Sequence, residues 1–148
     1  MRHKALFPWM FILAWATAAA AFAEDPASLA ALAEVGTPYL RGGESPQRGF
    51  DCSGLVVYVY RKALGIELPR RVAELKDVGK PVRLRELRPG DLLFYNTRRR
   101  PYSHVGIYVG SGRFVHAPRP GARVRVEDVG KRYWRSRFNG ARRIETPA

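Results

Sequence analysis

The residues best suited to chemistry in this chain are one cysteine and two histidines. The single cysteine, Cys52, lies in the segment Gly49–Leu55 and has no second cysteine with which to form an intramolecular disulfide. His104 and His116 follow downstream, and the third histidine, His3, lies in a stretch that we expect to be removed. A thiol becomes an effective nucleophile when a base accepts its proton and another group orients that base. The residue types therefore predict a cysteine hydrolase.

The N-terminus has the three-part pattern of a secretory signal peptide. A short basic start precedes an apolar run over residues 5–20, which is followed by the small residues Ala21 and Ala23. The run is short for a membrane-spanning helix, which needs about 20 apolar residues. We therefore expect a signal peptide over residues 1–23 and a single catalytic domain over residues 24–148. We also expect no stable membrane anchor, and a location in the periplasm or outside the cell.

The chain is strongly basic, with 26 lysine and arginine residues against 13 acidic residues and a formal net charge of +13. Net charge informs about partners rather than about fold. The arginines are scattered, and the aromatic residues do not alternate with them as in a groove for single-stranded nucleic acid. We therefore expect no nucleic-acid partner and, for an exported protein, an anionic cell envelope. An arginine-rich surface that is merely solvated is the alternative.

Helical patterns come first along the chain and strand patterns follow. A capping aspartate, a proline in the first turn and a glycine stop predict a short helix over residues 26–35. The apolar segment 53–64, which ends at Gly65, predicts a buried helix, although its β-branched residues also suit a strand. The remaining predictions are a helical piece at 72–76, strands at 91–95, 104–109, 113–116 and 123–126, a helical turn or two at 127–135, and a strand at 141–144. This order indicates an α+β fold with helices packed on an antiparallel sheet.

Cys52 lies at the N-terminus of the predicted helix over residues 53–64. Backbone N–H groups at a helix start have no partners within the helix, and the helix dipole there favours a thiolate, so we expect a lowered thiol pKa. The same N–H groups can stabilise the oxyanion of a tetrahedral intermediate. Asp51 is placed to cap this end of the helix.

The two histidines are predicted to share one face of a hairpin. Side chains alternate along a strand, so His104, Gly106 and Tyr108 lie on the same face. A three-residue loop over 110–112 pairs Gly106 with His116 and brings both imidazoles to that face, whereas a two-residue loop needs a bulge to do so. Gly106 would then leave room between the rings. A zinc site is the alternative, but no ligand pair such as CxxC or HxxxH is present, and we expect no metal or cofactor.

Five segments in this order resemble the NlpC/P60 family of cell-wall cysteine peptidases. They are Gly-Thr-Pro-Tyr at 36–39, Phe-Asp-Cys-Ser-Gly-Leu-Val at 50–56, Leu-Arg-Pro-Gly-Asp-Leu at 87–92, Ser-His-Val-Gly-Ile-Tyr at 103–108 and Phe-Val-His-Ala at 114–117. The resemblance covers roughly residues 29–144. It implies a papain-like α+β fold and hydrolysis of amide bonds in peptidoglycan stem peptides.

The resemblance also implies a role for each matched residue. Cys52 corresponds to the nucleophile, His104 to the base and His116 to the third member that orients it. Tyr39 is expected to face the cysteine and to help stabilise the oxyanion.

Asp51 and Ser53 match positions that hold a free stem-peptide amine in some members.

Two segments depart from the family pattern. Many members carry a Ser or Thr and a Gln after Leu-Pro-Arg, whereas residues 71–75 here read Arg-Val-Ala-Glu-Leu. The loop over residues 96–101 is unusually basic. Both departures concern the substrate groove rather than the catalytic residues.

We therefore expect an exported, monomeric endopeptidase acting on peptidoglycan, with the D-γ-glutamyl-diaminopimelate bond favoured by the resemblance. The alternatives with the same three residues are a crosslink (DD) endopeptidase, an amidase and an acyltransferase. A non-catalytic wall-binding protein is the alternative from another functional class.

Overall fold

The computed structural model describes residues 25–147 of the 148-residue chain. The expected signal peptide over residues 1–23 lies outside the described residues. Within residues 25–147, no helix is both long enough and apolar enough to cross a membrane.

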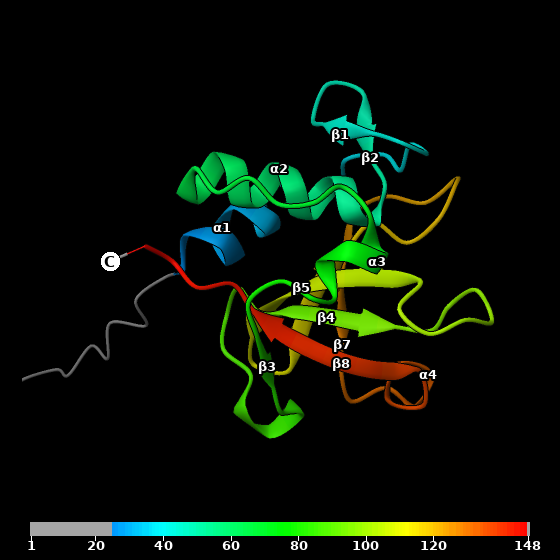
Figure 1. Cartoon of the computed structure of the whole chain (residues 1–148). Helices are drawn as coiled ribbons and strands as arrows, with labels where there is room; N and C mark the ends of the chain where they lie inside the picture. The colour runs from blue at the N-terminus through cyan, green and yellow to red at the C-terminus, as the bar shows by residue number, and fades with distance from the viewer. Residues whose placement is uncertain (1–24, 148) are drawn as a thin grey trace, which may run out of the picture.

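Two helices lie side by side over one face of a six-stranded antiparallel sheet (Figure 1). These two helices are α1 (Pro26–Ala33) and α2 (Cys52–Leu64). The described chain also forms the short helices α3 (Val72–Leu75) and α4 (Arg132–Arg135) and a 3₁₀-helix (Leu84–Glu86). In spatial order, the sheet strands are β3 (Lys80–Val82), β8 (Phe138–Arg143), β4 (Leu92–Tyr95), β5 (His104–Gly110), β6 (Arg113–His116) and β7 (Arg125–Asp128). A separate small hairpin consists of β1 (Glu44–Ser45) and β2 (Gly49–Phe50). The predicted α+β class is confirmed.

The start and end of α2 follow from single residues. Asp51 caps its N-terminus and accepts a hydrogen bond from the Gly54 N–H at 2.7 Å. Gly65 ends it with φ of 64°, in the left-handed region that a glycine adopts without steric cost. Cys52 is the first residue of α2, so the expected position of the cysteine at the helix start is confirmed.

Apolar side chains on both faces of the sheet hold the strands in place. On one face, the α2 residues Leu55, Val56 and Val59 are fully buried in one cluster with strand residues such as Phe94 and Ile107. A second cluster covers the opposite face and consists of Leu93, Tyr95, Phe114, Trp134 and Ala141. Because β4 has buried residues on both faces, its sequence is a continuous apolar run rather than an alternating one.

Several predicted boundaries were wrong. β7 begins two residues later than predicted and extends to Asp128, and β8 begins at Phe138 rather than at residue 141. The β1–β2 hairpin and β3 were not predicted. β1 and β2 have only two residues each, in a glycine-rich and proline-rich segment, and their pairing depends on tertiary contacts. β3 contains Pro81, which is tolerated because β3 is an edge strand.

Candidate active site

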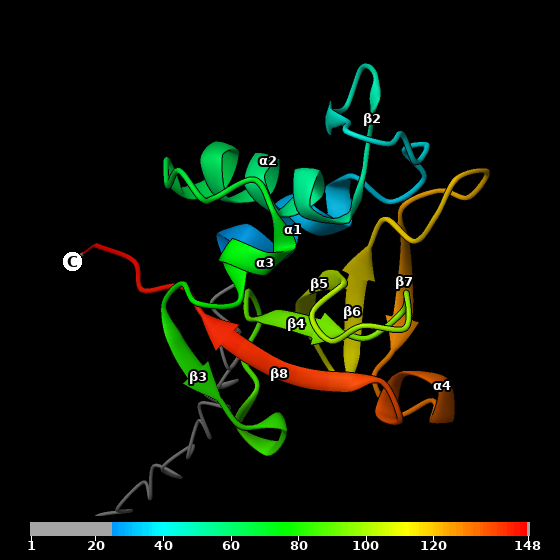
Figure 2. The same cartoon turned by 45° about the vertical axis from the view of Figure 1, so that its right-hand side comes forward.

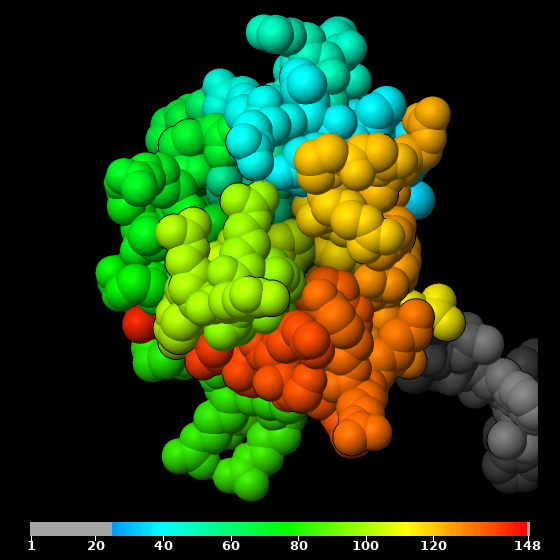
Figure 3. All heavy atoms as spheres, turned by 90° about the vertical axis from the view of Figure 1, so that its right-hand side faces the viewer, coloured from blue at the N-terminus to red at the C-terminus, as the bar shows by residue number. Residues whose placement is uncertain are grey.

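Cys52 lines a cleft that is formed by segments distant from one another in the sequence. Figure 3 shows a hollow between the cyan segment near residue 40, the lime loop over residues 96–102 and the yellow-orange loop over residues 117–123, and the first two of these segments also line the cleft of Cys52. The segment around Pro38 is fastened to the loop after β6, since Pro38 pairs with Arg123 and the Tyr39 N–H donates to the Ala122 carbonyl at 2.9 Å. These two segments lie beside each other in Figure 2. The contact places Tyr39 in the same hollow as Cys52.

Gly54 explains how the start of α2 can lie so close to the preceding loop. A Cβ atom added at Gly54 would overlap the carbonyl group of Gly43 and approach the Asp51 carboxylate. The Gly43 carbonyl in turn accepts a hydrogen bond from the Asp51 N–H at 3.1 Å. The position of Cys52 therefore depends on a glycine two residues further along the helix.

We expect Gly54→Ala to destabilise the protein by about 1–3 kcal/mol, because the added methyl group meets backbone that cannot rotate away. Urea unfolding would measure the loss, and the rate of iodoacetamide alkylation would report movement of the Cys52 thiol. The exposed substitution Lys62→Ala on the same helix is the control and should change stability by less than about 0.5 kcal/mol. Equal stability of Gly54→Ala and the wild type would contradict this packing.

The two histidines meet in the interior. The His104 Nε2 and His116 Nδ1 atoms are 2.7 Å apart, and the rings are nearly perpendicular at 85°. His104 is 4% exposed and His116 is fully buried. The approach requires both side chains on the same face of the β5–β6 hairpin, as the sequence predicted.

The β5–β6 hairpin has the predicted register but not the predicted three-residue loop. Gly110 pairs with Arg113, so the loop has two residues, and a bulge between Tyr108 and Gly110 restores the pairing of Ile107 with Val115. The role predicted for Gly106 was also wrong. A Cβ atom there would strike the Phe114 ring, so Gly106 leaves room for that ring rather than for an imidazole.

Glu127 is a member of the site that the sequence did not reveal. Its Oε2 lies 3.3 Å from His116 Nε2 and accepts a hydrogen bond from Trp134 Nε1 at 3.1 Å. The sequence placed residue 127 at the start of a helical turn, whereas β7 continues through it. Alternation along Arg-Val-Arg-Val-Glu also suggests that the valines face the core, yet Val126 is 37% exposed and Glu127 turns toward the buried histidine.

The order Glu127, His116, His104 determines which ring nitrogens carry protons. A carboxylate beside His116 Nε2 favours the proton on that atom, which leaves His116 Nδ1 as an acceptor. His104 Nε2 then donates to His116 Nδ1, so His104 Nδ1 is free of a proton and can act as a base. We assign these tautomers from the contact geometry.

The thiol does not have the lowered pKa that its helix position suggested. Burial raises the pKa of Cys52 above its ordinary value, and the Asp51 charge adds to this. The backbone of Val105 and Ser53 and the nearby Arg98 guanidinium act in the opposite direction without overcoming burial. Burial, His116 and Arg98 likewise hold the pKa of His104 well below its ordinary value. Both shifts favour the uncharged forms of the thiol and the imidazole.

The Asp51 carboxylate and the Ser53 hydroxyl are already engaged within the protein. Arg70 donates to Asp51 Oδ2 at 2.9 Å and to Ser53 Oγ at 2.6 Å, and it also pairs with Glu44 of β1 at 3.0 Å. Asp51 accepts from the N–H groups of Gly42 and Gly54 as well. The sequence did not predict that Arg70 would bind both residues expected to hold a stem-peptide amine. A substrate amine here would have to share Asp51 with Arg70.

Metal ligands do not gather in the described part of the chain. Among residues 25–147, no group of three His, Cys, Asp or Glu side chains is arranged to hold a metal ion.

Comparisons with known proteins identify relatives of the whole catalytic region. Residues 36–143 match the model of the NlpC/P60 family. The chain is 43% identical over 118 residues to the murein DD-endopeptidase MepH of Escherichia coli (strain K12), covering 77% of this chain and 43% of that protein. It is 44% identical over 112 residues to the gamma-DL-glutamyl hydrolase of Bacillus subtilis (strain 168), covering 75% and 27%. The chain thus spans less than half the length of either relative.

Solved structures show the same fold. The NlpC/p60 domain of the peptidoglycan hydrolase SagA superposes with a TM-score of 0.69 at 34% identity, covering 80% of this chain and 97% of that one. An NlpC/P60 family protein from Bacillus cereus ATCC 10987 superposes with a TM-score of 0.74 at 30% identity, covering 81% and 39%.

Proposed function

Because this chain belongs to the NlpC/P60 family, we propose that it is an exported cysteine endopeptidase that hydrolyses amide bonds in peptidoglycan stem peptides. Two observations support the proposal: Cys52 is the first residue of α2, and the nitrogens of a buried pair of histidines are 2.7 Å apart. The hollow of Cys52 and the hollow of the two histidines adjoin, since Arg41 and Arg98 line both. Two relatives named for peptidoglycan or glutamyl hydrolysis support the substrate class.

In the proposed mechanism, the Cys52 thiol gives its proton to Nδ1 of His104 as the sulfur attacks the amide carbonyl. Backbone N–H groups at the start of α2, with the Tyr39 hydroxyl beside them, stabilise the oxyanion. The His104 imidazolium then protonates the departing amine and leaves an acyl-enzyme. A water molecule, deprotonated by His104, hydrolyses the thioester and restores the thiol.

The imidazolium forms inside a buried site and needs stabilisation there. His116 Nδ1 accepts a hydrogen bond from His104 Nε2, and the negative charge of Glu127 partly opposes the decrease in pKa that burial causes at both histidines. The pKa of Glu127 itself is lowered to about 2, chiefly by its contact with His116, so the charge is present throughout the working range.

We expect Glu127→Gln to lower kcat/KM by about 10- to 100-fold, the usual loss for a charged hydrogen-bond partner. The amide keeps the size of the side chain beside His116, but the negative charge is gone. The pKa of His104 should therefore fall further, and the acid limb of the pH–rate profile should move to lower pH. Glu127→Asp, which keeps the charge, should retain an acid limb nearer the wild type. A Gln variant with wild-type rate and pH profile would exclude this role.

The bond that we propose is D-γ-glutamyl-diaminopimelate, as the family resemblance favours. The crosslink is the second candidate, because the relative MepH is named as a DD-endopeptidase. We further propose that Asp51 and Ser53 receive a free stem amine together with Arg70, so that the distance from that amine to Cys52 selects the bond.

Mass spectrometry of digested sacculi and of free stem peptides would test the proposed function. Release of L-Ala-D-Glu from free tetrapeptide stems is the expected result, with slower release from N-acetylated stems. Products cut only at the crosslink would favour the DD alternative. A transfer product would favour acyltransferase chemistry, and release from the glycan of intact stem peptides that begin with a free L-Ala would favour an amidase. Binding to sacculi without released fragments would identify a wall-binding protein.

A further inference from the structure

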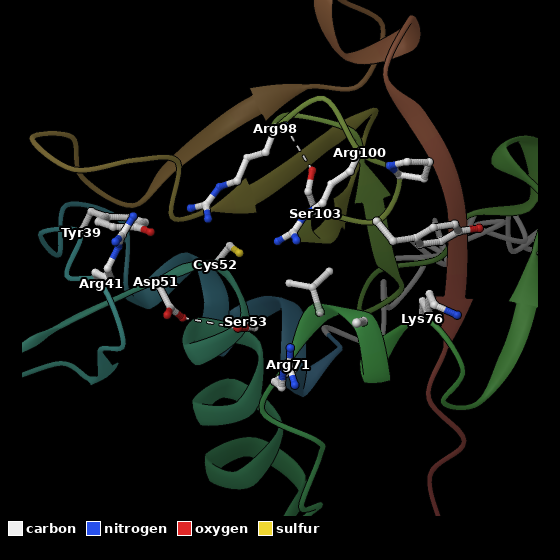
Figure 4. Close-up of a pocket in the computed structure, with 14 residues that line it drawn as sticks. Tyr39, Arg41, Asp51, Cys52, Ser53, Arg71, Lys76, Arg98, Arg100 and Ser103 are labelled. Carbon is white, nitrogen blue, oxygen red and sulfur yellow. Dashed lines mark hydrogen bonds between the residues drawn. The ribbon is translucent and has the colours of Figure 1, made fainter.

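The hollow beside Cys52 is lined by an excess of positive charge. Besides Cys52 and its neighbours, it contains five cationic side chains and one acidic side chain, in a volume of about 480 Å³. The cations are Arg41, Arg71, Lys76, Arg98 and Arg100, and the acid is Asp51. In Figure 4, Arg98 and Arg100 extend from the loop above the cysteine, Arg71 lies below it, and Arg41 lies beside Tyr39.

Four of these cations have no acidic partner among residues 25–147. Lys76 pairs with Asp77, and the one acid in the hollow, Asp51, pairs with Arg70. The ion pairs of the described chain include none made by the other four, which we call the arginine cluster: Arg41, Arg71, Arg98 and Arg100. Like charges gathered around one hollow repel one another. An anion bound among them would relieve that repulsion.

The loop that carries Arg98 and Arg100 is held in a defined conformation. The Ser103 hydroxyl accepts hydrogen bonds from the N–H groups of Thr97 and Arg98, at 3.0 and 3.2 Å. Arg99 and Tyr102 have φ of 57° and 54°, in the left-handed region that non-glycine residues adopt at a cost. Tyr102 is anchored to Asn139 of β8 through its N–H and its hydroxyl. The two arginines are therefore presented to the hollow from a constrained turn.

The arginine cluster adjoins the place where bond cleavage is proposed. Arg41 and Arg98 line both the hollow of Cys52 and the neighbouring hollow that contains His104 and His116. Both arginines therefore lie where the hollow of the proposed nucleophile adjoins the hollow of the proposed base. A group bound by these two arginines would lie close to the scissile amide.

We propose that the arginine cluster binds free carboxylates of the stem peptide next to the scissile bond, so that the enzyme selects carboxylate stems over amidated stems. The inference rests on the proposed function for its substrate. A γ-linked glutamyl residue keeps its α-carboxylate beside the scissile amide, and a diamino dicarboxylic acid keeps a second one on the other side. Guanidinium groups match carboxylates in shape and charge. Amidation keeps the shape of these groups but removes their charge.

The test compares two synthetic stem peptides that differ only in whether the glutamyl α-carboxyl group is free or amidated. Binding of each to the Cys52→Ala protein would be measured by calorimetry, and hydrolysis of each by the wild type through kcat and KM. We expect about 10-fold or greater preference for the carboxylate stem, chiefly in KM, because a charge-assisted hydrogen bond becomes a neutral one. Arg98→Gln and Arg71→Gln should each reduce this preference, measured as the ratio of kcat/KM for the two stems, to about threefold or less.

Arg83→Gln is the matched control, since it removes the same charge from outside the hollow and precedes the 3₁₀-helix. It should leave the preference unchanged. Equal binding of both stems to Cys52→Ala, or a preference that survives substitution in the arginine cluster, would overturn the carboxylate site even if both stems are hydrolysed. Preferential binding of the carboxylate stem without hydrolysis by the wild type would support the site and overturn the proposed function.

Discussion

Replacing Cys52 with alanine should abolish hydrolysis of stem peptides, with a loss of at least about 1,000-fold in kcat/KM, because no other group can form the acyl-enzyme. The fold should persist, since the change removes one sulfur atom from a half-buried residue at the edge of the cleft. Assays with a soluble stem peptide and thermal unfolding of the same preparation would measure the two effects separately.

Reagents that distinguish a thiol from a metal provide the control for this prediction. Iodoacetamide should inactivate the wild type, while a chelator should leave it active. Loss of activity on chelation, reversed by zinc, would contradict the thiol mechanism and restore the zinc alternative.

Replacing His104 with alanine should bring activity close to that of the Cys52→Ala protein, because the thiol then has no base. His116→Ala should retain more activity, since it removes only the acceptor that orients His104 and stabilises its charged form. His116→Asn should recover part of the loss, because an amide oxygen can accept the proton on His104 Nε2. Steady-state kinetics on the same soluble stem would rank the three variants.

Because His116 is fully buried and contacts Trp134 and Phe114, its replacement also removes packing. Thermal unfolding of each variant would show whether lost activity merely follows lost stability. If His116→Ala were as inactive as His104→Ala while folded, and asparagine gave no recovery, the two histidines would have to exchange roles or act together.

The local features of the fold were readable from the sequence because each depends on a few neighbouring residues. Asp51 and Gly65 mark the ends of α2 through a side-chain cap and a left-handed glycine. The apolar runs that became β4, β5 and β6 were recognisable because they are buried and continuous. The β1–β2 hairpin was not recognisable, since two-residue strands carry no pattern and form only where the rest of the chain holds them.

The sequence by itself identified the candidate reactive residues: a lone thiol at a helix start, and two histidines on neighbouring strands of one hairpin. Tertiary structure alone decided the electrostatics. Burial raises the pKa of Cys52 where the helix position alone predicted a decrease, because loss of hydration outweighs the backbone N–H groups. Glu127 and Arg70 came to the site from distant segments, and long-range pairing decides which side chains meet there. Alternation within one strand carries no information about such contacts.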